Sequence, residues 1–509
     1  MPIGGFISLF TPIFGPGTAE TLTLVLVPLL TLGGVIFAIA FAARGLLDRN
    51  GALLAALLVP TNLILVHQLS PLRIDHHGWQ ILTAAICLLA LLDDNRLRSG
   101  LIVGAAAALW AHISAEAVPY LALIGALLAV RYILDPREQP RLAAYLGSVA
   151  LASFLLFAAT QSAERWSQPH CDAISWPYLL PLAVMASLAG LTALRGVTGT
   201  LVARAALVSG VSAVALAVFL KAGPDCLAGP FATLSPLVRD YWYVHVLEGL
   251  PIWRQLDVVV IGMIWAPILG AVGTWLGWRG AADAAAARRW ATTAFLLAGS
   301  FMIGLAVVRA FGVANLYALP GCAFLLLRLL RRVRPIQKVA LRLPLTMGVI
   351  MLSTPTFAVI GTERIKKSAV ASTAALPEKQ VQCVSPEGMS GLVAMPPARI
   401  LAPLDIGPAL LAMTPHSTMA TGHHRNDEIM QQVIKLWLSD AENARRFVKA
   451  RGIEMVVYCR FLDEVRIYAA DSPKGFMAQL ERGEVPDWLE PVQVEGSRNL
   501  RVWRVKQGN

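Results

Sequence analysis

The sequence predicts a mainly α-helical, polytopic membrane bundle of about twelve spans, followed by a small α/β domain. Of its 509 residues, 56% are hydrophobic and only 15% are charged, and the mean hydropathy is +0.61. The apolar residues come in blocks of about 18–23, which is long enough to cross a bilayer core. A soluble globular protein of this size carries far more charge, so that class is excluded.

The apolar windows give the order of the predicted spans. Residues 1–19 are apolar but are interrupted by Pro2, Pro12 and Pro16, so we expect this segment to lie at the membrane interface. The transmembrane domain is expected over residues 20–361. Its spans are predicted at 20–43, 52–68, 78–92, 100–113, 115–134, 143–161, 174–194, 202–220, 256–278, 289–309, 311–330 and 340–361.

Basic residues orient this bundle. Arg and Lys favour one set of loops over the other by about three to one, and such residues mark the cytoplasmic side. The loops near 44–50, 93–99, 131–142 and 328–339 are therefore predicted to be cytoplasmic, with residues 362–509 outside, as in a bacterial inner membrane. Topology also accounts for the formal net charge of +11, so no nucleic-acid partner is expected.

The composition changes after about residue 362, where charges become frequent. Residues 362–380 indicate a linker, and residues 381–509 indicate an extracytoplasmic α/β domain. Its expected elements are strands at 399–402 and 455–459, a helix at 427–450, and an edge strand at 500–505.

The six cysteines divide into two groups. Cys87 and Cys322 fall inside apolar spans and are expected to be packing residues. The other four fall on the predicted outer side, where an oxidising compartment permits disulfides. The predicted pairs are Cys171–Cys226 and Cys383–Cys459.

An ionisable segment, residues 73–79, separates two almost purely apolar runs and has the sequence Arg-Ile-Asp-His-His-Gly-Trp. Such groups at the mouth of a span are costly unless they bind something. A carboxylate with an imidazole suits Mn²⁺ or Mg²⁺, so Asp75 and His77 are candidate metal ligands. The alternative is a helix N-cap, which would explain Asp75 but not the two histidines beside it.

Three more ionisable residues lie on the same predicted side. Glu248, in the aromatic-rich loop 221–255, could complete a metal shell or orient a nucleophile, or it could be a solvated charge. Arg309 ends a span and could bind a lipid phosphate, or its side chain could snorkel to the interface. Glu116 could support a metal ligand or simply begin a helix.

In the outer domain, His424 and Arg425 could contact a sugar or a phosphate of the substrate. The alternative is that they belong to a turn before the helix expected near Asp427.

The ionisable segment resembles a motif of the GT-C superfamily of polyprenyl-phosphate-dependent glycosyltransferases. Asp75-His76-His77 is similar to the Asp-His-His motif of the catalytic subunit of archaeal oligosaccharyltransferases. By that resemblance Asp75 and His77 would be metal ligands. Residues 244–251 are similar to the family's Ser/Thr-Val/Ile-x-Glu motif, which is followed closely by Pro, and Glu248 stands at the Glu position.

A third likeness lies near the end of the bundle. Arg309 with Tyr317-Ala318-Leu319-Pro320 looks like a spread-out version of the family's Arg followed by Tyr-Ala-x-Pro, whose Arg contacts the lipid-linked pyrophosphate.

The resemblance implies an integral membrane glycosyltransferase that moves a sugar from a polyprenyl-phosphate donor to an acceptor on the outer face of the membrane. The implied catalytic residues are Asp75 and Glu248, the implied ligands of Mn or Mg are Asp75, His77 and Glu248, and the implied substrate-binding residues are Arg309, His76 and Tyr317.

Two departures from the family's pattern bear on this expectation. The family's first acidic motif would precede residue 1, so the resemblance predicts a further span upstream, or else a non-catalytic truncated homologue. The Trp-Trp-Asp-Tyr-Gly motif that reads an acceptor peptide is absent, so a glycan or lipid acceptor is expected.

A transporter or lipid carrier is a further alternative to an enzyme. The sequence shows no internal repeat and its ionisable residues gather at one face, which favours an enzyme.

Overall fold

The computed structural model describes residues 2–192, 199–231, 233–355, 383–496 and 498–506. The chain divides into two compact units, which are described separately. Unit 1 comprises Met1–Ala232 and Glu248–Ala369, and unit 2 comprises Thr233–Leu247 and Val370–Asn509. The predicted linker at 362–380 lies outside the described residues.

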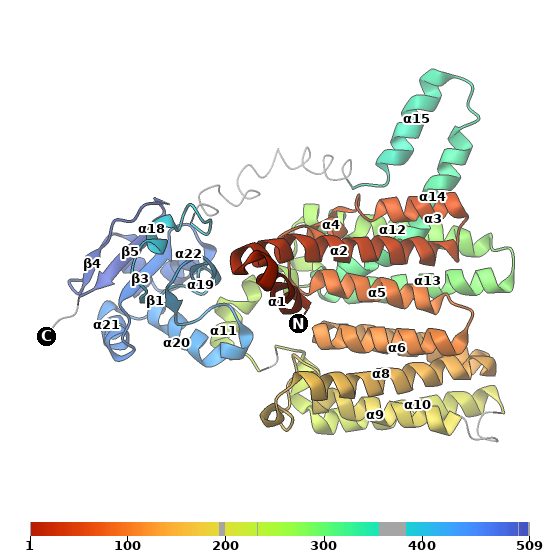
Figure 1. The fold of residues 1–509 in the computed structure, drawn as a ribbon, viewed down its shortest axis with the longest axis horizontal. Helices are drawn as coiled ribbons and strands as arrows, with labels where there is room; N and C mark the ends of the chain where they lie inside the picture. The colour runs from red at the N-terminus through yellow and green to blue at the C-terminus, as the bar shows by residue number, and fades with distance from the viewer. Residues whose placement is uncertain (1, 193–198, 232, 356–382, 497, 507–509) are drawn as a thin grey trace. The chain divides into compact units, whose positions relative to one another are not determined.

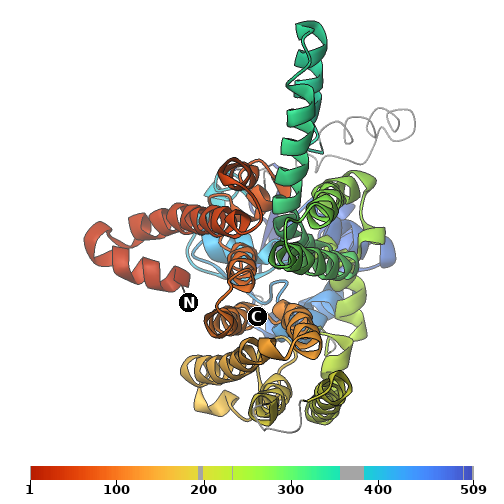
Figure 2. The ribbon, with the colours of Figure 1, turned by 90° about the vertical axis from the view of Figure 1, so that its right-hand side faces the viewer.

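Unit 1 is a bundle of helices that run side by side in Figure 1 and are seen nearly end-on in Figure 2. Its last helix, α15, extends away from the others in both views. The α-helices are α1 (Pro2–Phe14), α2 (Pro16–Arg44), α3 (Arg49–Leu58), α4 (Leu63–Leu69), α5 (His77–Leu91), α6 (Arg96–Ile113), α7 (Val118–Leu134), α8 (Gln139–Thr160), α9 (Trp176–Thr192), α10 (Leu201–Ala222), α12 (Asp257–Arg279), α13 (Ala284–Ala306), α14 (Phe311–Val333) and α15 (Val339–Met351).

The number of membrane-spanning helices is lower than the twelve that the sequence predicts. Each predicted window contains a helix, but in the described residues only seven helices are long and apolar enough to cross a membrane. The count rises to eight if α3 and α4, which meet at 62°, form one broken span. Apolar windows overestimate the count because hydropathy continues through turns, whereas α5, α9 and α15 have only 15, 17 and 13 residues. The chain is a multi-pass membrane protein.

Small residues allow the bundle's backbones to approach closely. A Cβ on Gly273 of α12 would overlap the carbonyl oxygen of Gly321 in α14, and one on Gly104 of α6 would lie 2.7 Å from the carbonyl oxygen of Tyr145 in α8. Helices in lipid associate through such close packing, because apolar side chains gain little by leaving a hydrocarbon solvent.

Unit 2 is an α/β domain with a five-stranded sheet of order β2-β1-β3-β5-β4. The pairs β2–β1 and β1–β3 are parallel, and the pairs β3–β5 and β5–β4 are antiparallel. Its elements are α11 (Pro236–Tyr241), α18 (Ser390–Val393), β1 (Arg399–Leu401), α19 (Gly407–Met413), β2 (Ser417–Thr418), α20 (Asp427–Leu438), α21 (Ala441–Ala450), β3 (Met455–Cys459), α22 (Asp463–Asp471), α23 (Phe476–Glu481), β4 (Leu489–Pro491) and β5 (Leu500–Val505).

Two details of unit 2 differ from the sequence predictions. The strand at 500–505 is present as β5 but is not an edge, because the three-residue β4 pairs with it; so short a strand ending in Pro carries little signal. The helix expected at 427–450 is two helices, because Asp440 caps α21 by accepting a hydrogen bond from Asn443 N at 2.8 Å.

The long loop at 221–255 is shared between the two units. Ser235 donates from both its backbone N and its hydroxyl to the Asp427 carboxylate, at 3.0 Å each, and Tyr241 packs on Tyr468 with ring centroids 5.8 Å apart. These contacts place Thr233–Leu247 in unit 2, whereas unit 1 resumes at Glu248.

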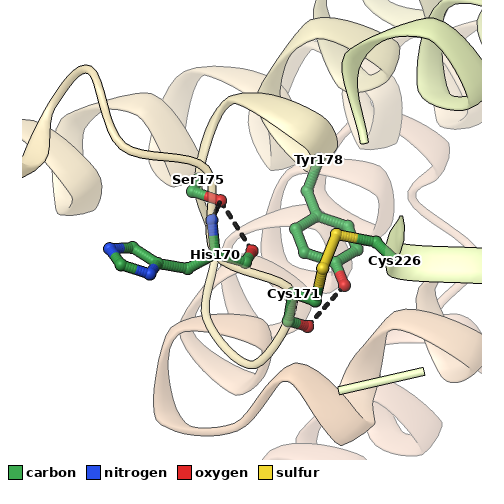
Figure 3. Close-up of a disulfide and its surroundings, with 5 residues drawn as sticks. All are labelled: His170, Cys171, Ser175, Tyr178 and Cys226. Atoms are coloured by element: carbon green, nitrogen blue, oxygen red, sulfur yellow. Dashed lines mark hydrogen bonds between the residues drawn. A yellow bond between two sulfur atoms is a disulfide. The ribbon is translucent and has the colours of Figure 1, made fainter. Parts of the chain in front are cut away.

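Both predicted disulfides are confirmed. Cys171–Cys226 joins the segment before α9 to the segment after α10, with Cα atoms 4.9 Å apart, and Cys383–Cys459 joins the segment before α18 to β3. Figure 3 shows that the Tyr178 hydroxyl donates to the carbonyl of Cys171, at 2.6 Å. Cys87 and Cys322 are free and buried, as expected of packing residues.

Candidate metal centre and active site

The ionisable segment lies in the turn between α4 and α5, at one end of unit 1 that we call the histidine end. Asp75 Oδ1 accepts hydrogen bonds from the backbone N of His77 at 2.9 Å and from its Nδ1 at 2.8 Å. Asp75 Oδ2 accepts from Arg73 Nε at 2.8 Å. Burial opposes ionisation of Asp75, but the bonds from His77 and the charge of Arg73 outweigh it and hold the pKa of the carboxyl below its ordinary value. Asp75 therefore both caps α5 and orients the His77 ring.

Among the described residues, the Nε2 atoms of the two histidines lack hydrogen bonds, although His76 Nε2 faces Glu116 Oε2 at 3.8 Å. His76 Nε2 and His77 Nε2 are buried without a hydrogen bond in the described part of the chain, and the two rings stack with centroids 4.2 Å apart. One ligand atom from each of His76, His77 and Glu116 lies within 4.8 Å of the others. Buried polar atoms are almost always satisfied in native proteins, so two such neighbours indicate a missing ligand.

Glu116 is presented by the short 3-10 turn η1 (Ala115–Ala117) between α6 and α7. Its Oε2 accepts from Gln80 Nε2 at 3.2 Å and lies 3.8 Å from His76 Nε2, while its Oε1 pairs with Arg309 Nη2. Gln80 is in turn fixed by Trp110 Nε1, which donates to Gln80 Oε1 at 3.0 Å. The Gln80 amide that reaches Glu116 is thus held in place by Trp110.

A cavity of about 20 Å³ opens among these groups. Its polar lining comprises Gln68, His77, Gln80, Glu116, Tyr120 and Arg309. This space accommodates one water molecule or one ion, but not a sugar.

Glu248 lies beside this group on η6 (Leu247–Gly249), and its side chain is 48% exposed. Its carboxylate oxygens lie 3.8 Å from Arg73 Nη2 and 3.8 Å from Arg309 Nη1. The segment that follows is held by unit 1, because Val308 N donates to Leu250 O at 3.0 Å. Glu248 is therefore a half-exposed carboxylate between two guanidinium groups.

The structure brings together five of the residues that the sequence singles out, namely Asp75, His76, His77, Glu248 and Arg309. It also brings Arg73 and Glu116 to this group. Arg73 belongs to the ionisable segment, but the sequence indicates no role for it. Glu116 was expected either to support a ligand or to begin a helix, and the structure places it within ligand distance of both histidines.

Of the other predicted substrate-binding residues, Tyr317 lies away from this group within unit 1, and His424 and Arg425 belong to unit 2. Tyr317 is fully buried in α14 and donates its hydroxyl to Ala84 O at 3.3 Å, so it does not face the cavity. His424 and Arg425 form the turn before α20 in unit 2, where the His424 ring stacks on His423 with centroids 5.1 Å apart. Their roles stay predictions.

The donor set at the histidine end fits a divalent cation. Two imidazole nitrogens and a carboxylate oxygen are ligands that Mn²⁺ and Zn²⁺ accept more readily than Mg²⁺, which prefers oxygen alone. A carboxylate behind a ligating histidine, here Asp75 behind His77, is the usual support of such a ligand.

No family model and no curated protein matches this sequence. Solved structures of the archaeal oligosaccharyltransferase AglB from Archaeoglobus fulgidus do match. Its complex with an inhibitory peptide and a dolichol-phosphate aligns with a TM-score of 0.63 and 14% identity, over 90% of this chain and 61% of that chain. The apo form of the oligosaccharyltransferase from the same organism aligns with a TM-score of 0.61 and 13% identity, with the same coverage of both chains. The complex with Zn and sulfate aligns with a TM-score of 0.50 and 13% identity, over 90% of this chain and 59% of that chain. The chain thus spans about three fifths of the solved enzyme's length, and the likeness is one of fold.

Proposed function

We propose that this chain, whose fold is that of the GT-C membrane glycosyltransferases, transfers a sugar from a polyprenyl-phosphate carrier to an acceptor at the histidine end of the bundle. The observation that carries the proposal is the pair of buried imidazole nitrogens beside Glu116 that make no hydrogen bond among the described residues. Such a set is expected of a cation site, and two arginines and a half-exposed carboxylate surround it.

His76, His77 and Glu116 would hold the cation. When bound, a divalent ion supplies the positive charge that stabilises a phosphate leaving group. The solved neighbour in complex with Zn and sulfate is a precedent for a metal and an oxyanion on this fold. For this chain we propose Mn²⁺ or Zn²⁺, because the donor set is richer in nitrogen than Mg²⁺ prefers.

The remaining side chains divide the other tasks. The Arg309 side chain is only 11% exposed and lines the cavity, so its guanidinium is placed to bind a donor phosphate in bidentate fashion. Glu248, which is more exposed, is placed to accept a proton from an acceptor hydroxyl. Asp75 bonds His77 Nδ1, which would leave His77 Nε2 as the atom that binds the cation.

We assign the lipid part of the donor to a second cavity in unit 1. An almost wholly apolar cavity of about 660 Å³ lies among α7, α8, α9 and α10, and it begins at Val118, two residues after Glu116. Tyr178 and Phe219 line it with aliphatic side chains of the four helices. A long isoprenoid chain suits such a lining, because apolar side chains make up most of it.

The proposal is tested by binding of a sugar-free polyprenyl phosphate to the purified chain in nanodiscs, measured by native mass spectrometry with and without Mn²⁺. We expect Mn²⁺ to tighten binding and Arg309→Gln to weaken it by about tenfold, the value of one charge-assisted contact. Arg165→Gln, a solvent-facing change outside the cluster, is the matched control. If the affinity for polyprenyl phosphate is the same with and without Mn²⁺ and in Arg309→Gln, the result would favour the lipid-carrier alternative and contradict the proposed transferase function.

A further inference from the structure

A second polar cavity lies at the opposite end of unit 1, which we call the arginine end. It opens where α5 and α7 finish and where α8 and α13 begin, and its volume is about 610 Å³. The 15-residue helix α5 separates it from the histidine end, a distance of about 20 Å along the helix. The cavity is therefore distinct from the proposed active site.

Two arginines in the lining of this cavity are already engaged in contacts within the protein. Arg141 is 4% exposed, and its guanidinium donates to Glu138 Oε2 at 2.8 Å, to the carbonyl of Asp93 at 3.0 Å and to Ser99 Oγ. Arg96 also pairs with Glu138, at 2.8 Å. These bonds brace the helix ends, so Arg141 and Arg96 have little capacity for a ligand.

Three other arginines in the lining retain donors without a hydrogen bond among the described residues. Arg289 is the most occupied of them, because its Nη2 donates to Asp94 Oδ2 at 2.6 Å while its Nε is buried without a hydrogen bond. Arg131 donates through Nη2 to Thr292 Oγ1 at 2.5 Å, but its Nη1 is buried without a hydrogen bond. The exposed Arg288 guanidinium makes no hydrogen bond or ion pair among the described residues. Two guanidinium groups that line one cavity repel each other and retain unused donors, which is the arrangement that an anion relieves.

The other half of the lining is apolar. Val130 and Leu134 of α7 are 48% and 68% exposed, and Phe295 of α13 is 37% exposed. Basic groups beside exposed apolar side chains at the ends of membrane helices suit a ligand that carries both a phosphate and hydrocarbon chains. The size of the cavity suits a lipid headgroup, since ligand pockets are typically about 300–1,000 Å³.

We propose that the arginine end binds the phosphate of an anionic phospholipid between Arg131 and Arg288, with the acyl chains lying along Val130, Leu134 and Phe295. Guanidinium binds phosphate with two parallel hydrogen bonds, so each of the two arginines adds a directed contact. The proposal concerns a site with no role in the transfer reaction and does not depend on it.

The test is lipid binding to the full chain in detergent, measured by native mass spectrometry and by thermal unfolding. We expect phosphatidylglycerol to bind about tenfold more tightly than zwitterionic phosphatidylcholine, and the double variant Arg131→Gln/Arg288→Gln to lose that preference. Arg331→Gln removes an exposed arginine that pairs with Asp48 at 2.9 Å and lies outside the lining, so it should leave the preference unchanged.

Each other outcome contradicts the proposal. Equal binding of the two lipids, or equal losses in the double variant and in Arg331→Gln, would show only a general charge effect. Inorganic phosphate that stabilises the chain as strongly as phosphatidylglycerol would identify a soluble ligand instead. The single variant Arg288→Gln, at an exposed position, keeps the test valid if the double variant does not fold.

Discussion

Two carboxyl groups removed from solvent, one in each unit, are treated differently by their surroundings. Glu464 of unit 2 is 5% exposed and accepts three hydrogen bonds, from Leu404 N at 2.8 Å, Asp405 N at 2.8 Å and the Tyr468 hydroxyl at 2.5 Å. Glu116 of unit 1 is also bonded, but two buried imidazole nitrogens beside it make no hydrogen bond in the part of the chain that the structure describes. Both carboxyl groups are removed from solvent, but only Glu116 has buried neighbours, His76 Nε2 and His77 Nε2, that lack a hydrogen bond among the described residues.

The difference separates a structural group from a binding group. Glu464 anchors the loop that follows β1, and its three hydrogen bonds satisfy its carboxylate without a ligand. Burial, and then the charge of nearby Asp405, raises the pKa of Glu464. A perturbed pKa alone would have pointed to Glu464 as a functional residue, whereas the bonding pattern points to the histidine end.

The largest effect is expected when a proposed ligand is removed. His77→Ala should lower the affinity for Mn²⁺ by about 100-fold or more, because one of three protein ligands is lost. Isothermal titration of the purified chain measures it. His170→Ala, in the loop before α9, is the control and should have no effect. Equal affinities for all three proteins would place the metal elsewhere.

A smaller loss is expected at the residue behind that ligand. Asp75→Asn should reduce Mn²⁺ affinity by about 10- to 100-fold, since the charge that polarises the His77 ring disappears. The free energy of unfolding should fall by at most about 1 kcal/mol, because Asn caps a helix nearly as well as Asp. If unfolding changes and metal affinity does not, capping is the whole role of Asp75.

In unit 2, Glu464 should make stability depend on pH. Its pKa in the folded state lies above the ordinary value of 4.5, so above that pH the unfolded chain releases its proton first. The free energy of unfolding of unit 2 should therefore fall as the pH rises from about 4.5 toward neutrality, by on the order of 1–2 kcal/mol. Hydrogen exchange of residues 455–471, corrected for intrinsic rates, measures the slope. A slope that persists unchanged in Glu464→Gln would assign it to another group.

The smallest effect on metal affinity is expected at Glu248. Its oxygens lie 3.8 Å from the two arginines and its side chain is 48% exposed, so Glu248→Gln should change Mn²⁺ affinity by less than about fivefold. Sugar transfer should fall much further if Glu248 accepts the acceptor's proton. A loss of metal affinity as large as that of His77→Ala would restore Glu248 as a ligand.

The sequence predicts the helical bundle, the α/β unit and both disulfides, because hydropathy, strand patterns and cysteine placement are local signals. It also singles out Asp75, His76, His77, Arg309 and Glu248. The sequence does not specify which atoms would bind the cation. In the structure both Asp75 oxygens accept hydrogen bonds from His77 and Arg73, and only the fold brings Glu116 close to the histidines.

The local sequence also does not predict that loop 221–255 is divided between the two units. Ser235 and Tyr241 are polar and aromatic like their neighbours, and only contacts with Asp427 and Tyr468, about 200 residues away, assign them to unit 2. The twelve expected spans reduce to seven or eight for a related reason, since a hydropathy window does not register where a helix bends or ends.

The central claim is that His76, His77 and Glu116 hold one divalent ion. Pulsed electron paramagnetic resonance of the purified chain loaded with one equivalent of Mn²⁺ tests it directly, because couplings to directly bound imidazole nitrogens are resolved. The account predicts two such nitrogens in the native chain and one in His77→Ala. Mn²⁺ that binds tightly without any coupled nitrogen would contradict it.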